Sequence, residues 1–216
     1  MSGDLLLLAD SQLLLRGDSA SALRQCVRRW CRRAGSSAYS AAYFGQANGN
    51  DPAFAELAQA GLAGLLDAPV QVHWVRDEQQ LPAEPCALVL LAGGDVAAGW
   101  QFLGRPRVRH WLTRCHARAD SLMIGISAGA IHLGRGVNPG RPELGCQTYL
   151  GWLPEPVAVH EEEAGWPSLR PAGGLAIVLG GGVWVTAHPH GYQWQAVGRG
   201  AQRRGADGVA RPLAGV

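Results

Sequence analysis

LMIGISAGAI, at residues 122–131, is the stretch that decides the fold. Its first five residues form a short apolar run, which predicts a buried strand. The run leads into Gly125-x-Ser127-x-Gly129, followed by small and apolar residues that can open a helix. This pattern is typical of a nucleophile elbow, a tight strand–turn–helix connection that raises a serine above the carboxyl edge of a sheet. The pattern can also arise by chance in a chain with 30 glycines, but the flanking strand and helix favour the elbow.

The small residues of this motif suit the tight turn that an elbow needs. Gly125 and Gly129 have no side chain, so the strand and the helix can approach closely around a strained residue. The backbone N–H of Ala128 then points toward the space beside the Ser127 hydroxyl. A serine hydroxyl is a weak nucleophile and also needs a base, an orienting acid and an oxyanion hole.

Before the elbow, strands alternate with helices. Apolar runs predict strands at residues 4–10, 38–44, 70–75 and 87–92, the last ending at Gly93-Gly94-Asp95. Helices are expected up to about Arg33, from Asp51-Pro52 onward, and in two pieces around Gly104 and Pro106. This order predicts an α/β fold with a doubly wound, mostly parallel sheet and ligands beyond the carboxyl ends of its strands.

After the elbow the composition changes. Residues 135–145 are rich in Gly, Pro and Arg and predict a loop that carries Glu143. A short strand over 157–160 ends at His160. Apolar segments at 175–179, 183–187 and 192–197 predict antiparallel C-terminal β-hairpins on the sheet edge. No linker divides the chain, so residues 1–216 are expected to form a single domain.

The composition narrows the classes of function. The chain has 216 residues, of which 47% are hydrophobic and 17% charged, and its net charge is +2. This balance favours a folded domain and argues against nucleic acid or a membrane as partner. There is no lysine, which excludes a Ser–Lys mechanism. The five cysteines lack metal-ligand spacing and suggest reduced thiols in the cytoplasm. We expect no metal, no cofactor and no membrane span, and leave a homodimer open.

Two residues are candidates for the rest of a catalytic triad. His160 is the best base, because it follows a strand end on the same side of the sheet as Ser127; alternatively, it is a surface histidine. Glu143 is the preferred acid, because it lies on a loop between Ser127 and His160. Glu155 competes with it, as do residues 161–163, a run of three glutamates that can also form a solvated face.

Two arginines are candidates for binding a carboxylate group of the substrate. A dipeptidase-like site must hold a carboxylate, which a guanidinium binds through two parallel hydrogen bonds. Arg16 follows the first predicted strand, and Arg141 lies beside Glu143. Each can instead be a solvated surface residue.

These motifs together resemble the peptidase E and cyanophycinase family of serine peptidases. The resemblance rests on the order Gly-Gly-Asp at 93–95, Gly-Ile-Ser-Ala-Gly-Ala at 125–130, Leu-Pro at 153–154 and His160. It implies a class I glutamine amidotransferase-like fold with three layers. By position it implies a triad of Ser127, His160 and Glu143. It also implies oxyanion-hole N–H groups from Gly94 and Ala128, with Asp95 as a substrate-binding residue.

The chain departs from that family at specific positions. Cyanophycinases have Gln where this chain has Val96, and the usual residues around the histidine differ here. The leading hypothesis is therefore a peptidase E-like serine hydrolase of a small peptide or amide, without a fixed side-chain specificity. The alternatives are a cyanophycinase-like activity, an esterase or acyl-transfer enzyme with the same elbow, and a catalytically silent binding protein.

Overall fold

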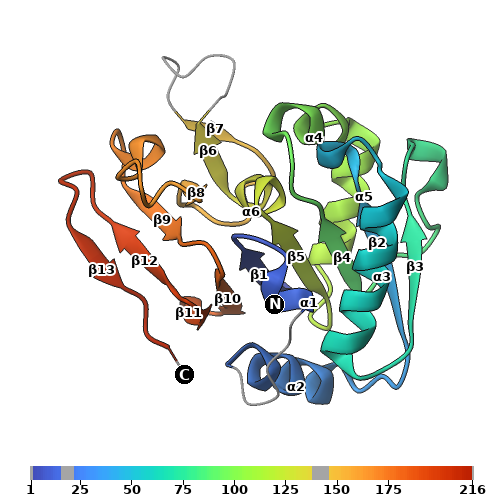
Figure 1. The fold of residues 1–216 in the computed structure, drawn as a ribbon. Coiled ribbons are helices and arrows are strands. Elements are labelled where there is room, and N and C mark those ends of the chain that lie inside the picture. The colour runs from blue at the N-terminus through green and yellow to red at the C-terminus, as the bar shows by residue number, and fades with distance from the viewer. Residues whose placement is uncertain (1, 16–21, 138–145, 216) are drawn as a thin grey trace.

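The computed structural model describes residues 2–15, 22–137 and 146–215. A seven-stranded sheet forms the centre of the molecule, in the order β11-β10-β1-β5-β4-β2-β3 (Figure 1). Its strands are β1 (Asp4–Leu8), β2 (Tyr39–Phe44), β3 (Val70–Trp74), β4 (Leu88–Leu91), β5 (Leu122–Ile126), β10 (Gly181–His188) and β11 (Gly191–Gly198). The first five run parallel, whereas β10 is antiparallel to both β1 and β11.

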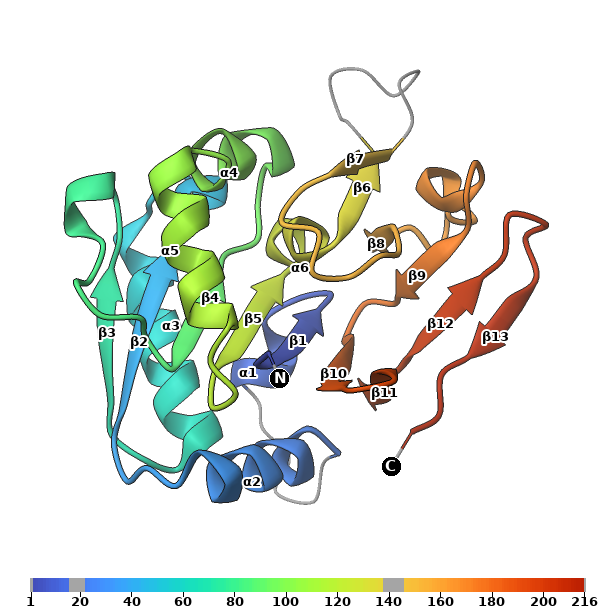
Figure 2. The same ribbon diagram turned by 180° about the vertical axis from the view of Figure 1, so that it is seen from behind.

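Helices cover both faces of this sheet, so the fold has three layers (Figures 1 and 2). Leu6 and Leu8 of β1 pack with α2 (Ala22–Ala34) and α3 (Pro52–Leu66). Leu5 and Leu7 pack on the opposite face with α4 (Val96–Leu103), α5 (Pro106–His116) and α6 (Ala128–Leu133). The unalternating leucine run of β1 is explained by this arrangement, because a parallel strand covered on both faces is apolar throughout.

The helix boundaries follow the local signals in the sequence. Asp51 caps α3, its carboxylate accepting a hydrogen bond from Ala53 N at 2.9 Å, and Pro52 is the first helical residue. The predicted interruption near Gly104 is confirmed, because α4 ends at Leu103 and α5 begins at Pro106. Shorter elements complete the first two thirds of the chain: α1 (Gln12–Leu15), η1 (Gln46–Asn48) and η2 (Glu78–Gln80).

The prediction for residues 175–179 was wrong, because they do not join the edge of the central sheet. β9 (Gly174–Ile177) lies in a second, four-stranded sheet with β8 (Val157–Val159), β12 (Ala201–Arg204) and β13 (Ala210–Pro212), in the order β13-β12-β9-β8. Ala176 packs on Trp166 and on Leu169, the last residue of η4 (Pro167–Leu169). Ile177, on the other face of β9, packs into the main hydrophobic core. Both faces of β9 are therefore covered. Only β10 and β11 form the predicted edge hairpin.

The prediction that a loop begins at Arg135 was also wrong. β6 (Arg135–Val137) pairs antiparallel with β7 (Cys146–Thr148). Gly136 permits this close packing, because a Cβ atom there would lie 2.4 Å from the Ile131 side chain. Glycine and arginine content predicted a loop, but pairing with a distant segment overrides local propensity. In the described part of the chain, no helix is long and apolar enough to cross a membrane.

Candidate active site

Ser127 occupies a strained turn between β5 and α6. Its backbone has a φ of 51° and a ψ of −110°, a combination that is costly for any residue with a side chain. Ser127 N donates to the Leu8 carbonyl at 2.8 Å, which ties the turn to the end of β1. Figure 2 shows β5 leading into α6 at the carboxyl edge of the sheet. Ser127 itself is half-buried, so its side chain is partly accessible.

The two glycines of the motif are required by close packing. A Cβ atom on Gly125 would lie 2.5 Å from the backbone of Gly129. A Cβ atom on Gly129 would lie 2.2 Å from the Leu91 carbonyl oxygen at the end of the adjacent strand β4. Side chains at these positions would push the strand, the turn and the helix apart. The motif therefore forms a genuine elbow and is not a chance occurrence of its letters.

The loop after β4 brings two more glycines to the elbow. A Cβ atom on Gly93 would lie 3.1 Å from Ser127 Cβ. Gly94 has a φ of +132°, and a Cβ atom there would lie 2.1 Å from the Ala47 carbonyl oxygen. Neither Gly94 N nor Ala128 N donates to another backbone or side-chain acceptor within residues 2–15, 22–137 and 146–215. Both N–H groups are thus free to donate to a ligand oxygen.

Asp95 caps the helix that follows this loop. Its Oδ1 accepts a hydrogen bond from Ala98 N at 2.8 Å at the start of α4, and its own N–H donates to the Ala47 carbonyl at 2.7 Å. Both bonds position Gly94, because they fix the residue after it. A direct contact of Asp95 with substrate stays a prediction.

His160 follows β8, and its strand belongs to the second sheet, not to the sheet of Ser127 as predicted. The reason is that β8 pairs with β9 and not with the edge of the central sheet. β8 nevertheless contacts α6, the helix that Ser127 begins. His160 is exposed and has a φ of 59°, so both candidate catalytic residues adopt a backbone conformation that is rare outside glycine.

Hydrogen bonds connect the loop after His160 to the end of β1, where the Leu8 carbonyl binds the Ser127 N–H. Glu162, two residues after His160, accepts from Leu179 N at 2.9 Å. The next N–H, that of Gly180, donates to the Asp10 carboxylate at 2.5 Å. Asp10 lies two residues after Leu8, the acceptor of the Ser127 N–H. Both candidates therefore lie at the end of the molecule where β1 and β5 finish. Within the described residues, no hydrogen bond joins the two side chains.

Two of the competing carboxylates, Glu155 and Glu161, are engaged elsewhere. Glu155 forms an ion pair with Arg203, with an O–N distance of 2.6 Å and a second contact at 3.1 Å. Glu161 accepts hydrogen bonds from the backbone N–H and the hydroxyl of Ser168, the former at 3.0 Å. These bonds give both carboxylates a structural role. The preferred acid Glu143 lies outside the described residues, as do Arg16 and Arg141.

His132 of α6 packs against the start of α4, the helix that follows the Gly94 loop. It is fully buried on α6, and its Nε2–H donates to the carbonyl of Val96, the first residue of α4, at 2.8 Å. Its ring stacks on Trp100. Burial lowers its pKa to about 4, so the imidazole is neutral at physiological pH. A single histidine on an apolar helix gave no signal of this role.

We also searched the described residues for a group of metal ligands and for a reactive cysteine. No group of three or more His, Cys, Asp or Glu side chains there could hold a metal ion. Cys26, Cys31, Cys86 and Cys115 are free thiols. Burial raises the pKa of Cys115 to about 12 and raises that of Cys86 as well, which disfavours the reactive thiolate.

The comparisons with known proteins identify the fold. No protein-family description and no curated protein matches this sequence. Among solved structures, a peptidase from an acI-B1 Actinobacterium aligns with a TM-score of 0.70 and 15% identity over 100% of this chain and 95% of that one. A protein assigned to peptidase E from Listeria monocytogenes EGD-e aligns with a TM-score of 0.53 and 11% identity over 99% and 100%. The chain therefore has the fold of peptidase E-like proteins.

Proposed function

We propose that this protein is a serine hydrolase that cleaves a small peptide or amide through an acyl-enzyme on Ser127. One observation supports this proposal above all. Ser127 is held in a strained elbow against Gly93, and the backbone N–H groups of the neighbouring Gly94 and Ala128 have no acceptor within the described residues. Strain of this kind persists where the surrounding structure fixes it, and it is concentrated at functional sites.

The reaction would follow the usual course of serine acyl transfer. The Ser127 hydroxyl attacks the substrate carbonyl while His160 takes its proton. The N–H groups of Gly94 and Ala128 stabilise the tetrahedral oxyanion. His160 then gives the proton to the leaving amine, and the acyl group stays on Ser127. Water, deprotonated by His160, releases the acid and restores the serine. Glu143 would hold the imidazole in the correct orientation.

Support for a peptide or amide substrate comes from the structural relatives. Two of them are described as a peptidase and as a peptidase E protein, and they align over nearly the whole chain. Arg16 and Arg141 remain the candidates for binding a substrate carboxylate. An esterase or acyl-transfer enzyme would use the same Ser127 machinery and differ only in its acceptor or leaving group.

A panel of dipeptides and one neutral ester, assayed with wild type and Ser127→Ala, tests this proposal. We expect hydrolysis of at least one dipeptide, lost in Ser127→Ala by a factor on the order of 10³ or more. Hydrolysis of the ester alone would favour the esterase. An absence of turnover on every substrate, in a protein that folds normally, would favour a silent binding protein.

A further inference from the structure

We propose that an apolar cavity beside Ser127 binds an apolar side chain of the substrate, next to the scissile carbonyl. This inference rests on the proposed function and names the substrate class of the same site. The cavity has a volume of about 220 Å³. It is bounded at its base by Gly93, Gly94 and Ile126, and its walls come from α1 and α3.

The position of the cavity ties it to the proposed reaction. Gly93 touches the elbow, since a Cβ atom there would lie 3.1 Å from Ser127 Cβ. Gly94 supplies a proposed oxyanion N–H, and Ile126 immediately precedes Ser127. A carbonyl oxygen bound by Gly94 N would therefore bring the neighbouring substrate side chain to the opening of this cavity.

The lining of the cavity selects for apolar groups. None of the described residues that line it is charged. Leu15, Phe54 and Leu57 line it and are 43%, 48% and 46% exposed. Large apolar side chains left this open gain free energy when a ligand covers them, at roughly 25 cal/mol per Å² of apolar surface. An aspartate side chain would lose its hydration here without gaining a charged partner from the described lining.

The polar groups of the cavity do not alter this preference. Asn48 Nδ2 donates to the Tyr43 hydroxyl at 2.9 Å, while the buried Asn48 Oδ1 has no hydrogen-bond partner among the described residues. Burial raises the pKa of Tyr43, which keeps the phenol neutral. Neither side chain of this pair is charged, and most of the described lining consists of leucine, phenylalanine, isoleucine, alanine and glycine.

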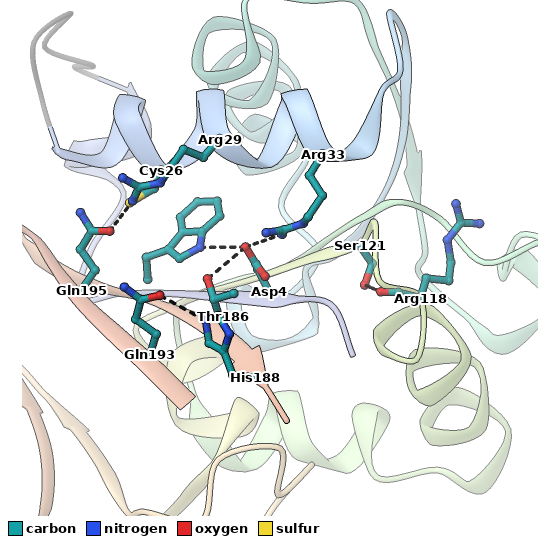
Figure 3. Close-up of polar contacts among 11 residues, drawn as sticks. Asp4, Cys26, Arg29, Arg33, Arg118, Ser121, Thr186, His188, Gln193 and Gln195 are labelled. Carbon is teal, nitrogen blue, oxygen red and sulfur yellow. Dashed lines mark hydrogen bonds and ion pairs between the residues drawn. The ribbon is translucent and has the colours of Figure 1, made fainter. Parts of the chain in front are cut away.

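Two other cavities of the molecule lie away from Ser127. The largest, about 690 Å³, is lined by arginines of β12 and β13 and by none of the proposed catalytic residues. Another, about 300 Å³, is lined in part by Asp4 at the opposite end of β1, and Figure 3 shows the polar contacts of this carboxylate. There the Asp4 carboxylate is already paired with Arg33 at 2.7 Å and accepts from Trp184 Nε1 at 2.9 Å. Of these three cavities, as the described residues line them, only the apolar one combines contact with the elbow and uncovered apolar side chains.

The inference is tested with the para-nitroanilides of leucine, aspartate and glycine. The double variant Phe54→Gln/Leu57→Gln makes the rim polar at two exposed positions. Val209→Gln is the matched control, because Val209 is an apolar residue that is 51% exposed and lies outside the cavity. The rate of Ser127 labelling by a fluorophosphonate gives a second readout of the reaction machinery.

We expect wild type to prefer the leucine substrate in kcat/KM. The double variant should lose about tenfold on leucine, little on glycine, and nothing in labelling rate, whereas Val209→Gln should behave as wild type. A preference for aspartate, or equal losses on leucine and glycine, would overturn the inference while labelling of Ser127 leaves the proposed function intact. No labelling and no turnover in the folded wild type would overturn both.

Discussion

Gly93 lies against Ser127 so closely that a Cβ atom on the glycine would be 3.1 Å from the Cβ of the serine. The contact joins the ends of the adjacent parallel strands β4 and β5. Gly94 follows directly, and the bond from the Asp95 N–H to the Ala47 carbonyl at 2.7 Å holds this loop in place. The proposed oxyanion site therefore depends on two neighbouring strand ends and on Ala47 of η1.

Two replacements of Ser127 distinguish the catalytic role of its hydroxyl from the strain in its backbone. Ser127→Ala and Ser127→Gly should both abolish hydrolysis, because each removes the hydroxyl. Ser127→Gly should be more stable than Ser127→Ala by about 1 kcal/mol, since only glycine relieves the strain of a φ of 51°. Urea unfolding of the two variants measures the difference. Equal stability would mean that the elbow is not strained.

Gly94 should be intolerant of a side chain. Gly94→Ala places a Cβ atom 2.1 Å from the Ala47 carbonyl, so the loop must move and its N–H leaves the oxyanion position. We expect a loss in kcat on the order of 10²–10³, the usual effect of removing one oxyanion donor. Gly64→Ala is the control: nothing lies within 4 Å of that Cβ in α3, and turnover should be unchanged. Normal turnover in Gly94→Ala would remove this N–H from the mechanism.

The three carboxylates should respond differently to amide substitution. Glu143→Gln should lower turnover, though less than His160→Ala does, because the imidazolium loses a charged partner but keeps its geometry. Glu155→Gln and Glu161→Gln should affect stability and not turnover, since Arg203 and Ser168 are their partners. Parallel steady-state assays and thermal unfolding measure both effects. A larger loss of turnover in Glu155→Gln than in Glu143→Gln would show that Glu155, and not Glu143, is the acid that orients His160.

Acid should destabilise the fold through His132. Its pKa is about 4 in the folded protein and about 6.5 when unfolded, so the unfolded state binds more protons between these values. The contribution of neutral His132 to the free energy of unfolding is fully present above pH 6.5. It falls by about 3 kcal/mol as the pH drops toward 4. His116, with its pKa also lowered by burial to about 4, adds to the same trend.

His132→Gln tests the assignment, because glutamine can still donate to the Val96 carbonyl but does not titrate. Its free energy of unfolding, measured in urea from pH 4 to 7, should depend less on pH than that of wild type. An unchanged slope would show that His132 is not the group responsible.

Local sequence predicted the elbow and the parallel sheet because their signals are local. Gly125 and Gly129 mark a turn that only glycine permits, and the apolar run of β1 marks a strand buried on both faces. The second sheet was missed, because the pairing of β9 with β12 joins residues far apart in sequence. The role of His132 was missed for the same reason: its partner Val96 is 36 residues away.

Labelling with a fluorophosphonate probe tests the central claim, that Ser127 is an activated nucleophile. Intact mass spectrometry of the full chain should show one phosphonyl adduct, peptide mapping should assign it to Ser127, and Ser127→Ala should take up none. His160→Ala, which keeps the hydroxyl but lacks the proposed base, should react at least about 10²-fold more slowly. A wild-type protein that is folded and remains unlabelled, or that is labelled at another residue, would contradict the account.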